Sequence, residues 1–290
     1  MTQDAETNLA WEARHRPRAA IAALVAALGL LVFNVAQQIL DRDMPSASGL
    51  ATLERAVQPG SVGDLPSLQG VVFEYMDTKN ALVMAIMLGG LIGFIGVGWA
   101  VGFLAVATRA RMPQLRRIMV YAPIVGGVVL GLSVLSLQIG RLMVVSDFLD
   151  GPRTVDAVLN SSNGLIQLAQ VLLLLGTFSL AVGMVLVSLN AMRTGLLTRM
   201  LGYLGVAAGA MMVLVPLPIV QIFWLVALGF ILLGRWPGGA PPAWRTGAAE
   251  PWPVPERAQR GTPRTAPETG PSLEKAAAPA GARRKRKKRH

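Results

Sequence analysis

The apolar part of this sequence contains few polar side chains that could bind a ligand, and most of them are glutamines. Arg141 follows Gln138 by three residues, so the two share one face of a helix. With Asp147 and Asn163 they indicate a polar vestibule that could bind a small polar ligand or a lipid headgroup. The proposed cluster consists of Gln38, Gln138, Arg141, Gln167, Gln170 and Gln221, with Gln37 beside its first member.

A structural role is the alternative for these glutamines. Glutamine is tolerated near a membrane interface, where it hydrogen-bonds neighbouring helices. The two interpretations differ in what substitution does. Gln138→Leu and Arg141→Ala should change a ligand response without changing insertion if the cluster is a binding site.

Catalytic chemistry finds little support in the sequence. The predicted membrane spans contain no Asp, Glu, Lys, Arg or His, and the two histidines, His15 and His290, lie outside them. The chain has no cysteine, and its span serines have no base in the same segments. We therefore expect neither an enzyme nor a metal or cofactor site.

Long apolar segments must position the polar cluster. The chain has 290 residues, of which 53% are hydrophobic and only 15% charged, whereas a soluble domain carries about 25% charged residues. A span needs about 20 apolar residues. The sequence thus predicts an all-α, polytopic membrane helix bundle with six transmembrane helices, at 19–40, 81–107, 118–140, 164–192, 200–217 and 219–234.

The basic residues orient these spans. Pro216 and Pro218 divide the last apolar stretch into two short helices, since proline breaks a helix. Arg and Lys then gather in the lead 1–18, the loops 108–117 and 193–199, and the tail. This pattern predicts a bacterial inner membrane protein with both termini on the cytoplasmic side. A cleaved signal peptide is the alternative for 19–40, but an h-region has only about 7–15 residues.

Glycines predict how the helices pack. The segment 81–107 contains six glycines, and small residues four apart let two membrane helices approach closely. We expect this span to be the buried centre of the bundle; homodimerisation through its glycine face is the alternative. The predicted packing glycines are Gly89, Gly93, Gly96, Gly127, Gly131, Gly205 and Gly209.

The C-terminal segment 237–290 differs from the rest of the chain. It is rich in Pro, Ala, Gly and Arg without apolar periodicity, which predicts a disordered tail. Its end is a basic run that we expect to bind anionic lipid headgroups, with a simple topology anchor as the alternative. We do not expect nucleic acid as a partner, because the run lacks interleaved aromatic residues. The run comprises Arg283, Arg284, Lys285, Arg286, Lys287, Lys288 and Arg289.

The segment 193–205, RTGLLTRMLGYLG, resembles a pattern in uncharacterised bacterial six-span membrane proteins. In those proteins a basic loop leads into a glycine-rich fifth span. The resemblance implies a fold and no established activity. We therefore expect a non-enzymatic integral membrane protein that senses or organises at the membrane, and the alternative is a small transporter or flippase-like carrier of a neutral or amphiphilic substrate.

Overall fold

The computed structural model describes residues 3–45, 62–159, 161, 163–214, 218–237 and 239–250. Within these ranges the protein is all-helical and has no strand, which confirms the all-α part of the predicted fold class. Four helices are long and apolar enough to cross a membrane, which indicates a membrane protein. They are α1 (Gln3–Arg42), α4 (Asn80–Arg111), α5 (Ile118–Asp150) and α7 (Gly164–Arg193).

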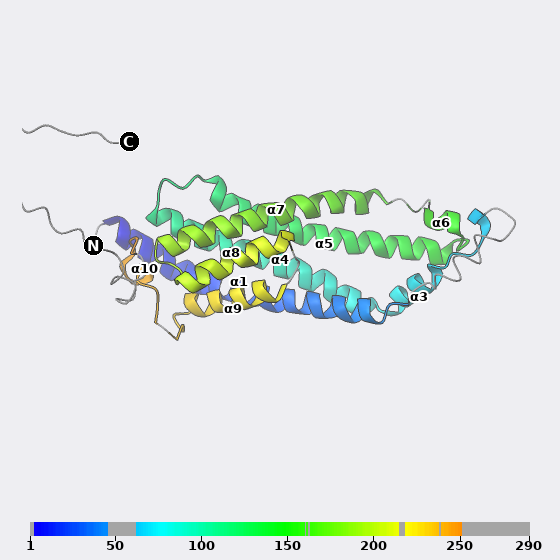
Figure 1. The fold of residues 1–290 in the computed structure, drawn as a ribbon, viewed down its shortest axis with the longest axis horizontal. Coiled ribbons are helices and arrows are strands. Elements are labelled where there is room, and N and C mark those ends of the chain that lie inside the picture. Colours follow the sequence, from blue (N-terminus) through cyan, green and yellow to red (C-terminus); the bar gives the residue numbers. More distant parts are fainter. Residues whose placement is uncertain are drawn as a thin grey trace, which may run out of the picture. The chain divides into compact units, whose positions relative to one another are not determined.

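Two further apolar helices are shorter. α8 (Arg199–Leu214) has 16 residues and α9 (Pro218–Leu232) has 15. At 1.5 Å per residue they are about 24 and 23 Å long, short of a hydrocarbon core of about 30 Å, whereas α5 is about 50 Å long. The long helices thus extend beyond the thickness of a bilayer, and α8 and α9 end partway along them (Figure 1).

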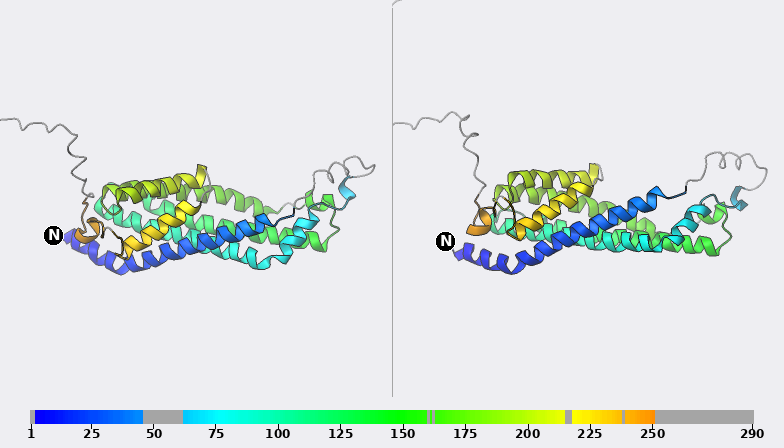
Figure 2. Two further views of the ribbon diagram at one scale, coloured as in Figure 1. Left: turned by 60° about the horizontal axis from the view of Figure 1, so that its bottom comes forward. Right: turned by 90° about the horizontal axis from the view of Figure 1, so that it is seen from below.

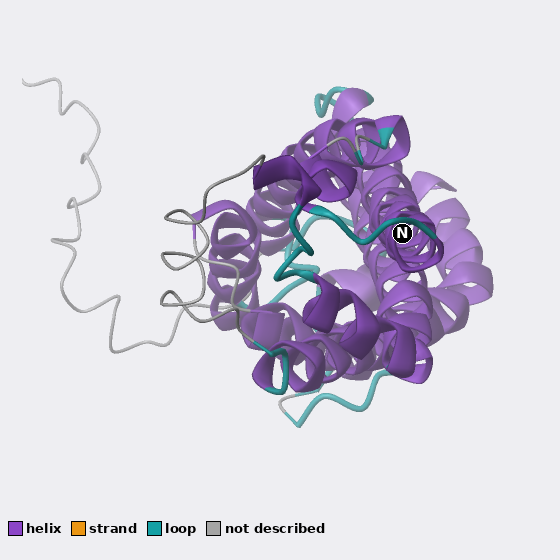
Figure 3. Ribbon diagram, turned by 90° about the vertical axis from the view of Figure 1, so that its right-hand side faces the viewer, coloured by secondary structure: helices purple, strands orange, loops and turns teal. Residues whose placement is uncertain are grey.

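The six helices follow one another around the bundle. α1 packs on α4, α4 on α5, α5 on α7, α7 on α8, α8 on α9, and α9 again on α1, so they surround a common axis (Figure 3). Because α8 and α9 are short, all six are present only in the half that contains the start of α1. We call this the N-terminal end of the bundle; it also carries α10 (Ala243–Thr246) (Figure 2).

The opposite end, which we call the far end, is built from the four long helices and short connecting elements. These are a 3₁₀ turn (Val62–Asp64), α3 (Gly70–Thr78) and α6 (Val155–Leu159) (Figure 1). A single residue, Lys79, separates α3 from α4. α5 ends at Asp150, and Gly151 is its C-cap.

α4 lies between α1 and α5 and approaches both through its glycines. A Cβ atom on Gly89 would lie 2.9 Å from the carbonyl oxygen of Gly29 on α1. On another face, a Cβ on Gly98 would lie 2.8 Å from the Pro123 carbonyl of α5. Such spacing excludes any larger side chain, and α1 of the same chain covers the Gly89 face.

The other predicted packing glycines also meet a neighbouring helix. Gly93 and Gly96 face α1, while Gly127 and Gly131 of α5 face α4. The glycines of α8 contact α7: Gly205 meets Ser188 and Gly209 meets the Ala181 carbonyl. The bundle therefore depends on backbone proximity at several helix pairs.

Two predicted boundaries differ from the structure. The lead 1–18 is not a separate segment, because α1 begins at Gln3 and continues through Pro17, with a bend in its N-terminal part (Figure 2). The prediction of disorder for 237–290 is wrong for 239–250, where α10 packs into the bundle through Trp244. The basic run 283–289 lies outside the described residues.

Candidate functional site

A pocket of about 360 Å³ lies at the far end, between α1, α3 and α5; we call it the far-end pocket. Its polar lining comes from two helices. α1 contributes Gln37 and Asp41, which share a helix face at a spacing of four, and α5 contributes Gln138 and Arg141. The helical extension of α5 to Asp150 is what places Arg141 on a rigid element.

The polar groups of the far-end pocket are incompletely paired. Gln37 Nε2 donates to both carboxylate oxygens of Asp41, at 2.9 and 3.0 Å. Gln138 is only 6% exposed and, within the described part of the chain, makes no hydrogen bond. Arg141 is exposed and forms no ion pair with any described residue. The Gln138 amide and the Arg141 guanidinium therefore have hydrogen-bonding capacity that a ligand could use.

The charges of the pocket come from two different helices. Asp41 belongs to α1 and Arg141 to α5. The hydroxyl of Tyr75, on α3, donates to the Leu40 carbonyl at 3.3 Å beside the pocket. Desolvation raises the pKa of Tyr75, and the carboxylates of Asp43 and Asp41 raise it further. The charged side chains that line the pocket are therefore one carboxylate, from α1, and one guanidinium, from α5.

The remaining members of the predicted cluster lie elsewhere. Gln38, Gln167 and Gln170 are exposed and do not line the far-end pocket. Asn163 caps α7 instead, since its side chain accepts a hydrogen bond from the Leu165 amide at 2.9 Å. Gln221 is buried in α9, away from the far end, because α8 and α9 stop short of it.

A second cavity, of about 310 Å³, lies where α8 and α9 end; we call it the central chamber. All six apolar helices line it, mostly with aliphatic and aromatic side chains. Its polar side chains are Asn34, Thr177 and Gln221. On α1, Asn34 precedes Gln37 of the far-end pocket by one helical turn, so the two cavities are neighbours along the bundle axis.

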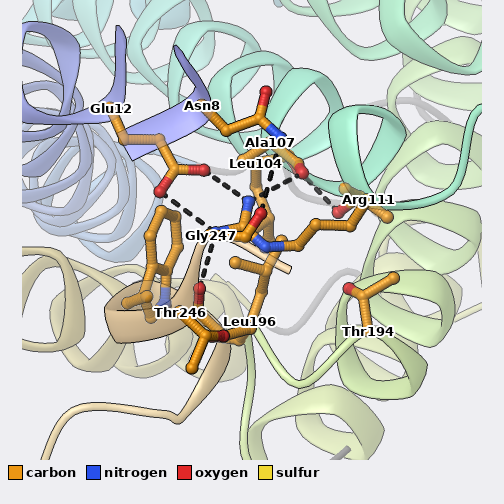
Figure 4. A network of polar contacts seen from close by, with 12 residues as sticks. Asn8, Glu12, Leu104, Ala107, Arg111, Thr194, Leu196, Thr246 and Gly247 are labelled. Carbon is orange, nitrogen blue, oxygen red and sulfur yellow. Dashed lines mark hydrogen bonds and ion pairs between the residues drawn. The ribbon is translucent and has the colours of Figure 1, made fainter. Parts of the chain in front are cut away.

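The N-terminal end carries a buried ion pair that we did not predict from the sequence (Figure 4). Arg111 of α4 pairs with Glu12 of α1, and the two side chains are 0% and 4% exposed. Arg111 also donates to the Ala107 carbonyl at 3.1 Å and to the Ala243 carbonyl of α10 at 2.7 Å. The pair thus joins α1, α4 and α10.

Trp244 of α10 completes this cluster. Its Nε1 donates to the Leu196 carbonyl at 2.9 Å, and the side chain is buried. The guanidinium groups of Arg16 and Arg111 lie 4.8 and 5.5 Å from its ring centroid, within cation–π range. Trp244 also stacks on Phe103 of α4. The segment after α9 therefore closes the N-terminal end.

A signal for this cluster exists in the sequence. Asn8, Glu12 and Arg16 are spaced by four residues, so they form one stripe of α1 that leads toward the buried Ala19 and Ala20. The stripe faces the fold: Asn8 donates to the Gly247 carbonyl and Arg16 to the Ile231 carbonyl. Polar lead residues can thus be interior residues of a longer helix.

Comparison of the chain with protein-family models, with curated proteins and with solved structures gives no match. The resemblance of 193–205 to uncharacterised six-span proteins therefore stays a prediction. In the part of the chain that the structure describes, no group of three or more His, Cys, Asp or Glu side chains could hold a metal ion. Fold and site define a helical membrane protein with a polar pocket at one end and an apolar chamber next to it.

Proposed function

We propose that this chain is a non-enzymatic membrane protein that senses or organises by binding the polar headgroup of an amphiphile in the far-end pocket. One observation carries the proposal: Asp41 of α1 and Arg141 of α5 line the same pocket and do not pair with each other. A headgroup that bears both charges complements such a lining. Gln138, which lines the same pocket, adds amide donors and an acceptor.

We infer that all six apolar helices lie in the membrane. α8 and α9 then enter from the side of the N-terminal end and return to it, which leaves both termini on one side. The charge distribution supports a cytoplasmic N-terminal end, because Arg109, Arg117 and Arg199 flank helices there. The far end carries mainly carboxylates, and a bacterial inner membrane is the location that we propose.

A flippase-like carrier is the second candidate. It is favoured by the central chamber, which would accept the hydrocarbon part of an amphiphile next to the far-end pocket. A carrier would also need a state in which the N-terminal end opens. In the described structure that end is closed by the Glu12–Arg111 pair and by Trp244.

Thermal unfolding of the purified protein in detergent tests the headgroup proposal. We expect monomeric dihexanoylphosphatidylcholine, which is zwitterionic, to raise the Tm more than the anionic phosphatidylglycerol or the uncharged diacylglycerol of equal chain length. Arg141→Ala should remove this difference and leave the Tm without lipid unchanged, since Arg141 is exposed and unpaired.

Arg153→Ala is the matched control. Arg153 also lies at the far end and is exposed, but it pairs with Glu74 and does not line the pocket. The proposal fails if Arg141→Ala keeps the wild-type response, or if Arg153→Ala loses it equally. A scrambling assay with fluorescent lipid in proteoliposomes separates the two candidates, because only a carrier accelerates lipid exchange between leaflets.

A further inference from the structure

The described polar side chains of the central chamber each direct one donor at a backbone carbonyl. Asn34 Nδ2 donates to the Leu30 carbonyl at 2.8 Å, and Thr177 Oγ1 donates to the Leu173 carbonyl at 2.7 Å. Gln221 Nε2 donates to the Ala208 carbonyl of α8 at 3.0 Å. Each amide keeps a second N–H and its oxygen, and the Thr177 hydroxyl can still accept a hydrogen bond, so the three side chains retain both acceptors and amide donors.

Gln221 is the strongest of these acceptors. The residue is 7% exposed, and its Oε1 is a buried oxygen without a hydrogen-bond partner among the described residues. The bond from Nε2 to Ala208 fixes the orientation of the amide, so the oxygen cannot exchange places with the nitrogen. A buried acceptor left unpaired in an apolar setting is costly, which favours an occupant that donates to it.

We propose that the central chamber binds a neutral lipid with a free hydroxyl, a lipid alcohol, whose O–H donates to Gln221 Oε1. Its hydrocarbon chain packs on apolar walls that include Phe33, Phe94 and Leu130. A charged ligand is disfavoured, because the described lining contains no ionisable side chain and burying a charge is expensive. A ligand with acceptors alone leaves Gln221 unsatisfied.

The lengths of α8 and α9 give such a lipid a route. α8 and α9 fill the space between α7 and α1 along only part of the bundle. The chamber lies at the level where α8 ends and α9 begins. A lipid alcohol from the surrounding bilayer enters sideways at this level. The inference goes beyond the headgroup proposal, because it concerns a different cavity and does not require Arg141 or Asp41.

Photolabelling of the full-length protein in nanodiscs tests this proposal. The probes are a diazirine-bearing dodecanol and its methyl ether, which differ only in the hydroxyl donor. We expect the alcohol to label the chamber helices about tenfold more efficiently at equal concentration, as for one hydrogen bond to a buried acceptor. Gln221→Met should abolish this preference while the ether still labels weakly.

Thr177→Val is a second variant, in case Gln221→Met disturbs the contact with α8. It removes one chamber acceptor with little change of shape and should reduce the preference for the alcohol by a smaller factor. Gln167→Met, an exposed substitution outside both cavities, is the control and should label like wild type. Equal labelling by alcohol and ether in the wild type, or no labelling of the chamber helices by either, overturns the proposal. Neither result depends on the response to phosphatidylcholine, so this proposal and the headgroup proposal can fail separately.

Discussion

The two ends of the bundle use charged residues in opposite ways. At the N-terminal end, Glu12 and Arg111 are buried and paired with each other. At the far end, the pair of Arg153 and Glu74 joins side chains that are 51% and 59% exposed, 3.2 Å apart. Arg141, nearby in the far-end pocket, has no described ionic partner at all.

This difference separates groups that hold the fold from groups that can bind. A buried charge must keep its partner, because removing one member leaves the other unpaired in a medium of low dielectric. An exposed charge is solvated and can exchange water for a ligand at little cost. The charged residues of the N-terminal end therefore stabilise the fold, whereas those of the far end are able to bind a ligand.

The largest expected effect is at the buried pair. Arg111→Met leaves Glu12 buried without its partner and removes the contact with α10, so it should lower the free energy of unfolding by about 3–5 kcal/mol. Denaturant unfolding in detergent measures the loss. At the far end, Arg153→Met breaks the exposed pair and should cost less than about 1 kcal/mol. Similar losses in both variants would refute the contrast between the ends.

The second effect concerns the closure by α10. Trp244→Ala removes a buried ring, its bond to the Leu196 carbonyl and its contacts with Arg16 and Arg111. We expect a loss of about 3 kcal/mol or more and faster proteolysis after α9, as for other buried tryptophans. Trp99, which is 58% exposed, is the control, and Trp99→Ala should change stability little. Unchanged proteolysis in Trp244→Ala would mean that α10 does not close this end.

The predictable part of the fold follows from apolar length. Uncharged runs of 20 or more residues have few alternatives to a helix in a bilayer, so the positions of α4, α5 and α7 follow from composition. The structure of the segments beyond those runs does not follow from composition. Glu12 and Arg16 look like solvated lead residues, and Trp244 stands among prolines, because their burial depends on partners that are distant in sequence.

Site residues were predictable from the sequence only where their spacing places them on one face of the same helix. Gln138 and Arg141 line one pocket because a spacing of three on α5 places them together. The prediction failed for Gln221, because the sequence did not reveal how far α9 extends toward the far end. Gln37 and Asp41 complete the pocket, although only their neighbour Gln38 was chosen from sequence. Whether Gln37 or Gln38 faces the pocket depends on how α1 is rotated about its own axis. The packing of α1 on α4 determines this rotation.

A third, smaller effect tests the packing that both ends share. Gly89→Val places a side chain against the backbone of Gly29 and should destabilise the bundle by about 1–3 kcal/mol through overpacking. Gly164→Ala is the control, since a Cβ at Gly164 meets nothing within 4 Å. Thermal unfolding in detergent measures both. A crosslink between two copies through position 93 would instead show that this face contacts another molecule, as the homodimer alternative requires.

The smallest expected effect per residue concerns the basic run 283–289, which lies outside the described residues. A polybasic segment gains about 1 kcal/mol per Lys or Arg near an anionic leaflet, and salt weakens this attraction. A peptide of residues 253–290 should therefore float with vesicles that contain phosphatidylglycerol and stay behind with pure phosphatidylcholine. Replacing the run with glutamines should remove the binding. If the unchanged peptide binds both vesicle types equally, electrostatic attraction is not the basis of binding. The run then contributes only to the positive-inside bias and does not otherwise distinguish the two ends of the bundle.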